Sequence, residues 1–437
     1  MRLLKTIIKW SLITLVPVLI GVAFLYSTLS KKINKDLVAS LLEAKKNIRV
    51  DIDDVRPSLF TGKVNLEGIL IGPRDANADN GVLLDQRTKP SPSDTRIIIS
   101  KISLKINLID YLFGKLSIRS LIIDGLDLSY YVDANGDHSL DPLLDPPRYI
   151  NGVINPEYEI KKKRRELAKL KRKLKSDEDD FLRESFNASE FPMPTTLSEL
   201  VIREGGVRVR LEKSGNNVFF SNIEGDITNF DVDPNNLRDH NSAYLKLSSN
   251  LKVTGADARS EYASFDLKAS GTIKPFDPSS GFLNPDLVTD ITVLEGSKIL
   301  SLPLATRLAS TLEQLEKSGL DVSVIDDELV IGRETTFSLG LKNYVIRAVD
   351  ALPVIINGNQ LIIDQGSWLN TANDEHLINA SFTFSEDISN KTFEKSNEYL
   401  SEIVGKGVAS AVSELIFSPV TKNGNIYIPF VLSLIHI

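Results

Sequence analysis

The sequence predicts a mainly β fold with accessory helices. It would begin with an N-terminal transmembrane helix and continue as an elongated, curved antiparallel β-sheet groove built from repeats. Three features support this prediction: apolar and polar residues alternate along many runs, a glycine-containing segment recurs, and one long uncharged stretch lies near the N-terminus. Alternation with period two is typical of strands that have one apolar face and one solvated face.

The uncharged stretch covers residues 10–29 and has lysine or arginine on both sides. An α-helix of about 20 residues spans roughly 30 Å, the thickness of the apolar core of a bilayer. We therefore expect an uncleaved membrane anchor, whose residues include Trp10, Leu12, Leu15, Leu19, Phe24 and Leu29. A cleaved signal peptide is the alternative hypothesis, but the stretch lacks an A-x-A-like site and is longer than a usual signal core. The cysteine-free, strand-rich remainder favours a location outside the cytoplasmic membrane.

Residues 96–137 contain the clearest alternation, and the rest of the chain is organised around them. They predict three consecutive strands, with a break at residues 110–114 and a turn at Gly125. Such strands form a meander whose apolar face must be covered by something. The candidate residues for a lipid groove on this face are Ile98, Ile102, Leu104, Ile106, Leu116, Ile118, Ile122, Leu128, Tyr130 and Val132.

Part of this meander is repeated. Residues 59–72 align with residues 112–125, and a looser copy follows at residues 197–205. Self-similarity on this scale indicates stacked supersecondary units that share one continuous core. An extended, repetitive sheet is therefore favoured over a closed globule.

The predicted organisation has four parts. Residues 1–35 form a cytoplasmic stub and the anchor, 36–145 a first β module, 146–190 a charged helical insert, and 191–437 a continuing β region with two amphipathic helices. Helices are expected over residues 36–47, 157–184, 304–315 and 390–416. Outside the meander, strands are expected over residues 48–55, 62–71, 197–203, 207–212, 217–225, 242–253, 262–272, 320–325, 335–341, 354–356, 360–364, 377–384 and 425–432.

Two of these helices carry specific expectations. Ten of the fifteen residues from Lys161 to Lys175 are basic. This helix is either a solvated insert that rests on a neighbour by a narrow apolar seam, or a basic face for anionic lipid headgroups, where each cation contributes about 1 kcal/mol. In the last helix, Gly405 and Gly407 lie within the helical pattern, which predicts close helix packing.

No catalytic signature is present. The sequence has no cysteine, no nucleophile elbow, no phosphate-binding loop and no dinucleotide fingerprint. Residues 133–141 resemble a calcium loop, but His138 and Leu144 occupy positions that need glycine and a carboxylate, so an ordinary turn is expected. The histidines lack metal-ligand spacing, and the formal net charge of −7 argues against nucleic-acid binding. We expect no enzymatic activity, no metal and no cofactor.

Residues 112–137 resemble the N-terminal module of the AsmA-like family of bacterial envelope proteins, which are related to bridge-like lipid-transfer proteins with a β groove. The similarity lies in a short loop, Gly-Lys and an apolar residue, a strand, Asp-Gly, a strand and Asp-Ala-Asn-Gly. Residues 423–433 are similar to the family's C-terminal strand, where Leu434 replaces the usual glycine. The odd ending after this strand leads us to expect a natural chain that is longer at its C-terminus.

The resemblance implies a single-pass protein of the bacterial inner membrane with most of its chain in the periplasm. It implies a partly open groove that binds or moves lipid acyl chains for outer-membrane assembly or homeostasis. The implied partners are phospholipid or another envelope lipid, the inner membrane and other envelope proteins. The alternative function is a structural or assembly scaffold of the envelope, with a closed core and protein partners.

Overall fold

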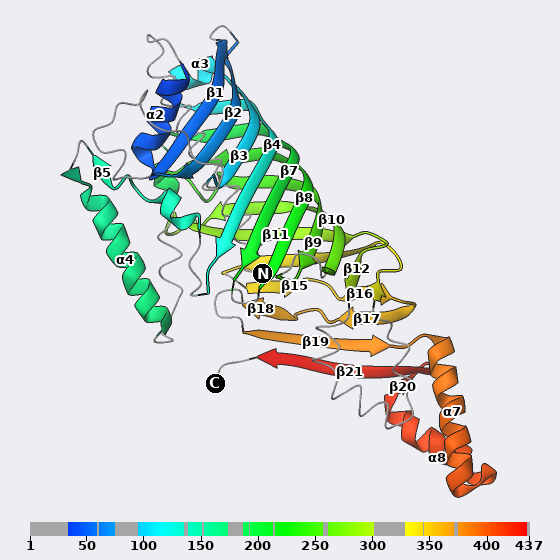
Figure 1. Cartoon of the computed structure of the whole chain (residues 1–437). Helices are drawn as coiled ribbons and strands as arrows, with labels where there is room; N and C mark the ends of the chain where they lie inside the picture. The colour runs from blue at the N-terminus through cyan, green and yellow to red at the C-terminus, as the bar shows by residue number, and fades with distance from the viewer. Residues whose placement is uncertain are drawn as a thin grey trace. The chain divides into compact units, whose positions relative to one another are not determined.

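The computed structural model describes residues 34–434, and it confirms a mainly β fold with accessory helices (Figure 1). Its strands form one large mixed sheet. Within this range the description leaves out residues 59–60, 75–94, 135–138, 151–152, 174–186, 192, 213–214, 257–260, 301–327, 344 and 371–374. The chain forms two compact units. Unit 1 contains Met1–Asn250 and Ala269–Val288, and unit 2 contains Leu251–Lys268 and Thr289–Ile437.

Unit 1 begins with a helix and an antiparallel ladder of four strands. The elements are α2 (Lys35–Lys45), β1 (Ile48–Ser58), β2 (Lys63–Pro73), β3 (Ile97–Ile106) and β4 (Leu116–Val132). The side chain of Asn34 starts α2 by accepting a hydrogen bond from the backbone N–H of Leu37. The break predicted at residues 110–114 is built around a short helix, α3 (Leu108–Leu112), whose first turn is capped by Asn107.

The next strand, β7 (Thr195–Leu211), pairs with β4 in parallel, so the prediction of an antiparallel sheet is wrong at this position. A parallel pair needs a long crossover, and the segment between the two strands supplies it. That segment contains η2 (Asp141–Leu144), β5 (Tyr149–Ile150), β6 (Val153–Ile154), α4 (Pro156–Lys173) and η3 (Ala188–Glu190). After β7 the chain returns in antiparallel β8 (Asn216–Val232).

Gly125 lies inside β4, so the turn predicted there is wrong. Its φ of +65° is in the left-handed region, and Gly68 of β2 (φ +63°) and Glu204 of β7 (φ +51°) share this conformation. The flanking pairs place Gly68 and Gly125 on either side of Ser100, and Glu204 beside Gly125. The left-handed residues of β2, β4 and β7 therefore lie in one row across the sheet, with Ser100 of β3 between Gly68 and Gly125. Glycine adopts this conformation at the lowest cost. The strands continue through this row, which is why two predicted strands, 197–203 and 207–212, form the single strand β7.

The core of unit 1 lies against one face of these strands. Its most completely buried side chains include Ile52, Leu116, Ile118, Leu121, Leu140, Leu197 and Val232. Leu140 precedes η2, so the crossover contributes to the covering of the sheet. In the same core, the Phe191 ring packs edge-on against Phe276, with 6.0 Å between ring centroids. The sheet continues with β9 (Asn241–Thr254), β10 (Glu261–Phe276) and β11 (Leu283–Val293).

Helix α4 belongs to the predicted charged insert. Its Lys161 lies 3.9 Å from the buried carboxylate of Asp145. Two residues of its predicted apolar seam, Ile160 and Leu167, are exposed by 54% and 56%. The rest of the predicted helix, residues 174–184, lies outside the described part of the chain.

Unit 2 contains short antiparallel strands. They are β12 (Lys298–Leu300), β13 (Glu328–Val330), β14 (Thr335–Lys342), β15 (Val345–Ala348), β16 (Leu352–Ile356), β17 (Asn359–Ile363), β18 (Trp368–Asn370), β19 (His376–Thr383), β20 (Thr421–Lys422) and β21 (Asn425–Leu434). A continuous ladder runs from β16 through β17 and β19 to β21. The strand predicted over residues 320–325 and the helix predicted over residues 304–315 lie outside the described residues.

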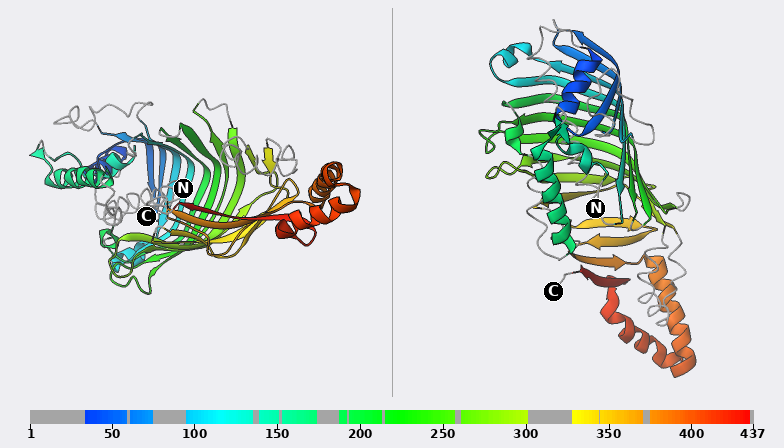
Figure 2. Two further views of the ribbon diagram at one scale, coloured as in Figure 1. Left: turned by 90° about the horizontal axis from the view of Figure 1, so that it is seen from below. Right: turned by 60° about the vertical axis from the view of Figure 1, so that its left-hand side comes forward.

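The predicted helix over residues 390–416 is two helices, α7 (Glu386–Val404) and α8 (Lys406–Phe417), followed by η5 (Ser418–Val420). Gly405, with φ +83°, ends α7 by donating its N–H to the carbonyl of Ser401. The chain then folds back, as the orange and red helices of Figure 2 show. A Cβ added at Gly405 or Gly407 would meet no atom within 4 Å, so close packing at these glycines is a wrong prediction.

In the part of the chain that is described, none of the helices combines the length and the apolarity that a bilayer crossing requires. The predicted anchor at residues 10–29, with Trp10, Leu12, Leu15, Leu19, Phe24 and Leu29, lies outside that part.

Candidate functional site

Most of the predicted groove residues lie in the core of unit 1. Those with an exposed fraction of 5% or less are Ile102, Leu104, Ile106, Leu116, Ile118, Leu128 and Tyr130. Ile122 and Val132 are half-buried. Ile98 is 40% exposed, whereas its neighbours Ile97 and Ile99 are buried, so its assignment to the groove face is wrong. The buried positions of β3 change from odd to even numbers across Ser100 and Lys101, next to the row of left-handed residues.

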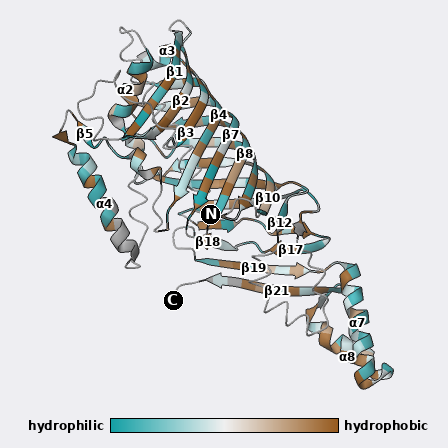
Figure 3. Cartoon of the chain, viewed as in Figure 1, coloured by the Kyte–Doolittle hydropathy of each residue, from teal (hydrophilic) through white to brown (hydrophobic). Residues whose placement is uncertain are grey.

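The structure brings these residues together with others that alternation alone does not find. Leu104 pairs with Leu121 across β3 and β4, and Leu121 pairs with Leu200 of β7. These three side chains are 2% exposed or less. Leu121 falls outside the predicted pattern because the register shifts between Lys105 and Ile106. Figure 3 shows hydrophobic residues along β4, β7 and β8, the strands that support this buried face.

A second apolar face lies in unit 2, on the ladder of β16, β17, β19 and β21. Paired residues on neighbouring strands point to the same side of a sheet. One row of pairs consists of Val354, Leu361, Phe382 and Ile428, and the next of Leu352, Ile363, Ala380 and Phe430. We call these eight residues, together with Ile356, Phe384 and Ile426, the unit 2 apolar face.

One end of this face is closed by the helices that follow it. Phe384, Phe417 and Ile426 form a buried cluster, against which Ile388 and Phe393 pack. The rings of Phe393 and Phe417 meet edge-to-face, with 5.1 Å between their centroids. Ser389 supports the contact, because its hydroxyl accepts a hydrogen bond from the backbone N–H of Ile426 at 3.0 Å. The hairpin of α7 and α8 therefore covers the last row of the unit 2 apolar face.

The next row is only half-buried. Val354, Leu361, Phe382 and Ile428 all keep an intermediate exposure in the structure. The opposite face of the same strands has a different composition, since its corresponding row consists of Ile355, Gln360, Thr383 and Tyr427. Both rows are half-buried, but of the two only the row with Val354 is apolar throughout, which makes this face the better candidate for an apolar ligand.

The hairpin carries further exposed apolar side chains away from the strands. Tyr399, Ile403, Val408 and Leu415 are exposed by 66%, 61%, 51% and 76%. The predicted apolar stripe of this segment is thus divided. Phe393 packs inward, Leu400 and Val412 are half-buried, and the others face outward.

Metal chemistry has no support in the described residues, where no group of three His, Asp or Glu side chains could hold a metal ion. His240 is engaged with Asp231 at 2.6 Å, and this hydrogen bond raises the pKa of its imidazole. The residues of the rejected calcium loop are only partly described, since residues 135–138 fall in a gap.

Comparison with known proteins gives no relative on which to base a function. No family model matches the chain, and no curated protein and no solved structure matches it.

Proposed function

We propose that this chain is an anchored protein of the bacterial inner membrane whose periplasmic β-sheet binds lipid acyl chains and takes part in outer-membrane assembly or homeostasis. The proposal rests on the unit 2 apolar face. Its row of Val354, Leu361, Phe382 and Ile428 is half-buried, and one end of the face is closed by α7 and α8. Phospholipid or another envelope lipid is the proposed ligand.

Physical chemistry favours an apolar ligand at this face. Each Å² of apolar surface removed from water contributes about 25 cal/mol, which corresponds to about 0.8 kcal/mol for each buried methylene group. Val354, Leu361, Phe382 and Ile428 present side chains of this kind in one row across four strands. An extended acyl chain that lies along the row would remove water from all of them and would need no specific hydrogen bond.

Two features of the sequence support the membrane setting. The uncharged residues 10–29 have the length of a bilayer-spanning helix. Residues 112–137 resemble the AsmA-like family, and this resemblance implies a periplasmic sheet tethered to the inner membrane.

Photocrosslinking in living bacteria tests the proposal on the full chain. A benzophenone amino acid replaces Phe382 on the unit 2 apolar face or, as the matched control, Thr383, its neighbour on the opposite face of β19. After irradiation, mass spectrometry identifies the adducts. We expect lipid adducts at position 382 and at least tenfold fewer at position 383. Equal lipid yields at the two positions, or protein adducts alone at position 382, would refute acyl-chain binding at this face.

A scaffold function is the second candidate, and one observation favours it. The residues of unit 1 predicted to line a groove are mostly buried, with Leu104 at 2% and Ile118 at 1% exposure. A filled core leaves no apolar surface for a ligand, and the exposed residues of α7 and α8 would then contact a protein partner. In the crosslinking experiment this function predicts adducts with one defined envelope protein at Tyr399 and no lipid adduct at position 382.

A further inference from the structure

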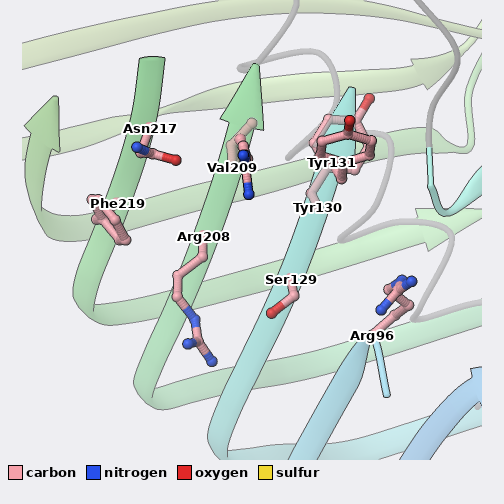
Figure 4. Close-up of a pocket in the computed structure, with 9 residues that line it drawn as sticks. Arg96, Ser129, Tyr130, Tyr131, Arg208, Val209, Asn217 and Phe219 are labelled. Atoms are coloured by element: carbon pink, nitrogen blue, oxygen red, sulfur yellow. The ribbon is translucent and has the colours of Figure 1, made fainter. Parts of the chain in front are cut away.

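Unit 1 contains a hollow that acyl-chain binding does not explain. Its volume is about 380 Å³, and its lining includes three arginines, Arg96, Arg208 and Arg210. Figure 4 shows the side chains of Arg96 and Arg208 on either side of Ser129. In a chain with a formal net charge of −7, three guanidinium groups around one hollow call for a specific explanation.

The register of the sheet accounts for this grouping. The backbone N–H of Ser129 donates to the carbonyl of Arg96 at 2.8 Å. Ser129 also pairs with Arg208, and two positions further along the strands Tyr131 pairs with Arg210. Across β7 and β8, Arg208 pairs with Phe219 and Arg210 with Asn217. The hollow is therefore lined by two neighbouring rows from β4, β7 and β8, by Tyr130 and Val209 between these rows, and by Arg96 directly before β3.

These rows alternate along β4 and β7 with core residues. Tyr130 and Val209 are 5% and 2% exposed, whereas Tyr131 and Ser129 on the intervening positions of β4 are half-buried. Alternation along a strand sends successive side chains to opposite faces. The arginines thus lie on the solvated face of strands whose other face is fixed in the core, and this support keeps the two rows in register.

Acidic groups lie near Arg208 and Arg210. Asp127 Oδ2 accepts a hydrogen bond from the Nη2 of Arg208 at 2.5 Å. Glu212 accepts hydrogen bonds from the Tyr131 hydroxyl and from the backbone N–H of Ala134, which lower the pKa of its carboxyl. The negative charge of Asp133 acts in the opposite direction and raises the pKa of the same carboxyl. Arg210 interacts with Glu212 through its charge, but among the described residues it forms no ion pair within 4.0 Å, so its planar N–H groups can donate to an anion.

We propose that this hollow binds a phosphate mono- or diester, with Arg96, Arg208 and Arg210 around its oxygens and Ser129 and Asn217 beside them. Guanidinium groups match phosphate because each can give two parallel N–H donors to two oxygens. Phe219 forms an apolar wall of the hollow, which suits an ester with an attached carbon skeleton. The ester is either a lipid headgroup or a free small molecule, and the test below distinguishes these sources.

Isothermal titration of the full chain in a non-ionic detergent measures binding of two probes, inorganic phosphate and a soluble short-chain phosphatidylglycerol. The variants are Arg208→Gln, Arg210→Gln and the charge-conserving Arg210→Lys. The matched control is Arg203→Gln, since Arg203 also lies on β7, is exposed and pairs with Asp124 at 3.9 Å, outside the hollow. Circular dichroism verifies that each variant is folded.

We expect each glutamine variant to weaken binding of the probes about tenfold or more, Arg210→Lys to weaken it less, and Arg203→Gln to leave it unchanged. Phosphatidylglycerol binding at least tenfold tighter than phosphate, with phosphate competing, identifies a headgroup site; equal affinities identify a site for free phosphate esters. Absence of binding for both probes, or the same loss in Arg203→Gln as in Arg210→Gln, would overturn the proposal. The result is independent of crosslinking at position 382, because the hollow and the unit 2 apolar face share no residue.

Discussion

Asn241 binds both backbone groups of Phe276. Its Nδ2 donates to the Phe276 carbonyl at 2.6 Å, and its Oδ1 accepts from the Phe276 N–H at 3.1 Å. The Asn241 residue is 4% exposed, and the Phe276 ring packs against Phe191 in the core of unit 1. One buried carboxamide therefore fixes the position of an aromatic core residue 35 positions further along the chain.

Replacement of this carboxamide should destabilise unit 1. We expect Asn241→Ala to lower the free energy of unfolding by about 1–3 kcal/mol, because the buried N–H and C=O of Phe276 lose their partner. Urea denaturation monitored by far-ultraviolet circular dichroism measures the change. Asn236→Ala is the control, since Asn236 is exposed and its Nδ2 bonds only the Asp239 side chain. A loss below about 0.5 kcal/mol in Asn241→Ala, the size expected of a surface change, would contradict this role.

The buried pair of Glu43 and Arg49 gives a second stability prediction. Glu43 Oε1 accepts the backbone N–H of Val50 at 2.9 Å, and Glu43 Oε2 lies 3.3 Å from Arg49 Nη1. The exposed fractions of the two side chains are 3% and 8%. Glu43→Ala removes the buried acceptor of the Val50 N–H and one partner of the Arg49 guanidinium, so we expect a loss of about 1–3 kcal/mol in urea denaturation. Asp387→Asn, which breaks the exposed pair with Lys391, should give no measurable change.

Gly125 should tolerate a side chain less well than Gly114. Both have positive φ, so a Gly→Ala change costs each about 1–2 kcal/mol. At Gly125 an added Cβ would also lie 2.8 Å from the Cβ of Ser100, whereas at Gly114 it would meet nothing within 4 Å. We expect Gly125→Ala to lower the melting temperature more than Gly114→Ala, and Ser100→Gly to recover part of the difference. Equal melting temperatures of the two alanine variants would contradict this prediction, because they would mean that Ser100 of β3 shifts to accommodate the added Cβ at no cost in stability.

Asp277 gives a prediction about pH. Its Oδ1 accepts the backbone N–H groups of Ser279 and Ser280 at 2.9 and 2.8 Å, and the Ser279 hydroxyl adds a short bond that is the main cause of a pKa lowered from 3.8 to about 2. Because the folded-state pKa lies below the unfolded value, its stabilising contribution is complete above pH 3.8 and disappears as the pH falls through about 2. Asp277→Asn should abolish this component of the acid dependence in unfolding experiments. In the unsubstituted protein, carbon-13 NMR titration of the Asp277 carboxyl measures the pKa itself. A pKa near 3.8 would contradict the turn geometry.

Alternation in the sequence predicts where most strands lie, but it does not predict which side chains are buried. Ile98 and Ile122 follow the even-numbered pattern, yet Ile97, Ile99 and Leu121 occupy the core instead. The cause is tertiary: a left-handed row crosses the strands and the register of β3 and β4 shifts near Lys105, and period-two counting contains neither effect. The role of Gly125 was unpredictable for the same reason, because a glycine inside a strand and a glycine in a turn look alike in a single sequence.

The unit 2 apolar face had a signal that could have been recognised. Leu352, Val354 and Ile356 alternate, as do Ile426, Ile428 and Phe430. What the sequence lacks is the order β16, β17, β19, β21 that brings the two segments onto one face, because each short strand has several possible neighbours. The arginine hollow is equally dependent on pairing, since Arg96 and Arg208 meet only through Ser129 of β4.

The parallel pairing of β4 with β7 has a consequence for how the chain acquires its structure. The ladder from β1 to β4 and the hairpin of β7 with β8 each form from neighbours in the sequence, whereas Ser117 and Thr196 meet across 79 positions. Closing so long a loop has an entropic cost that must be met before any of the new contacts form. We therefore expect the docking of these two halves to be the slow event in the maturation of unit 1, and the interval before it to be the period when chaperones and proteases have access to the apolar side of β4.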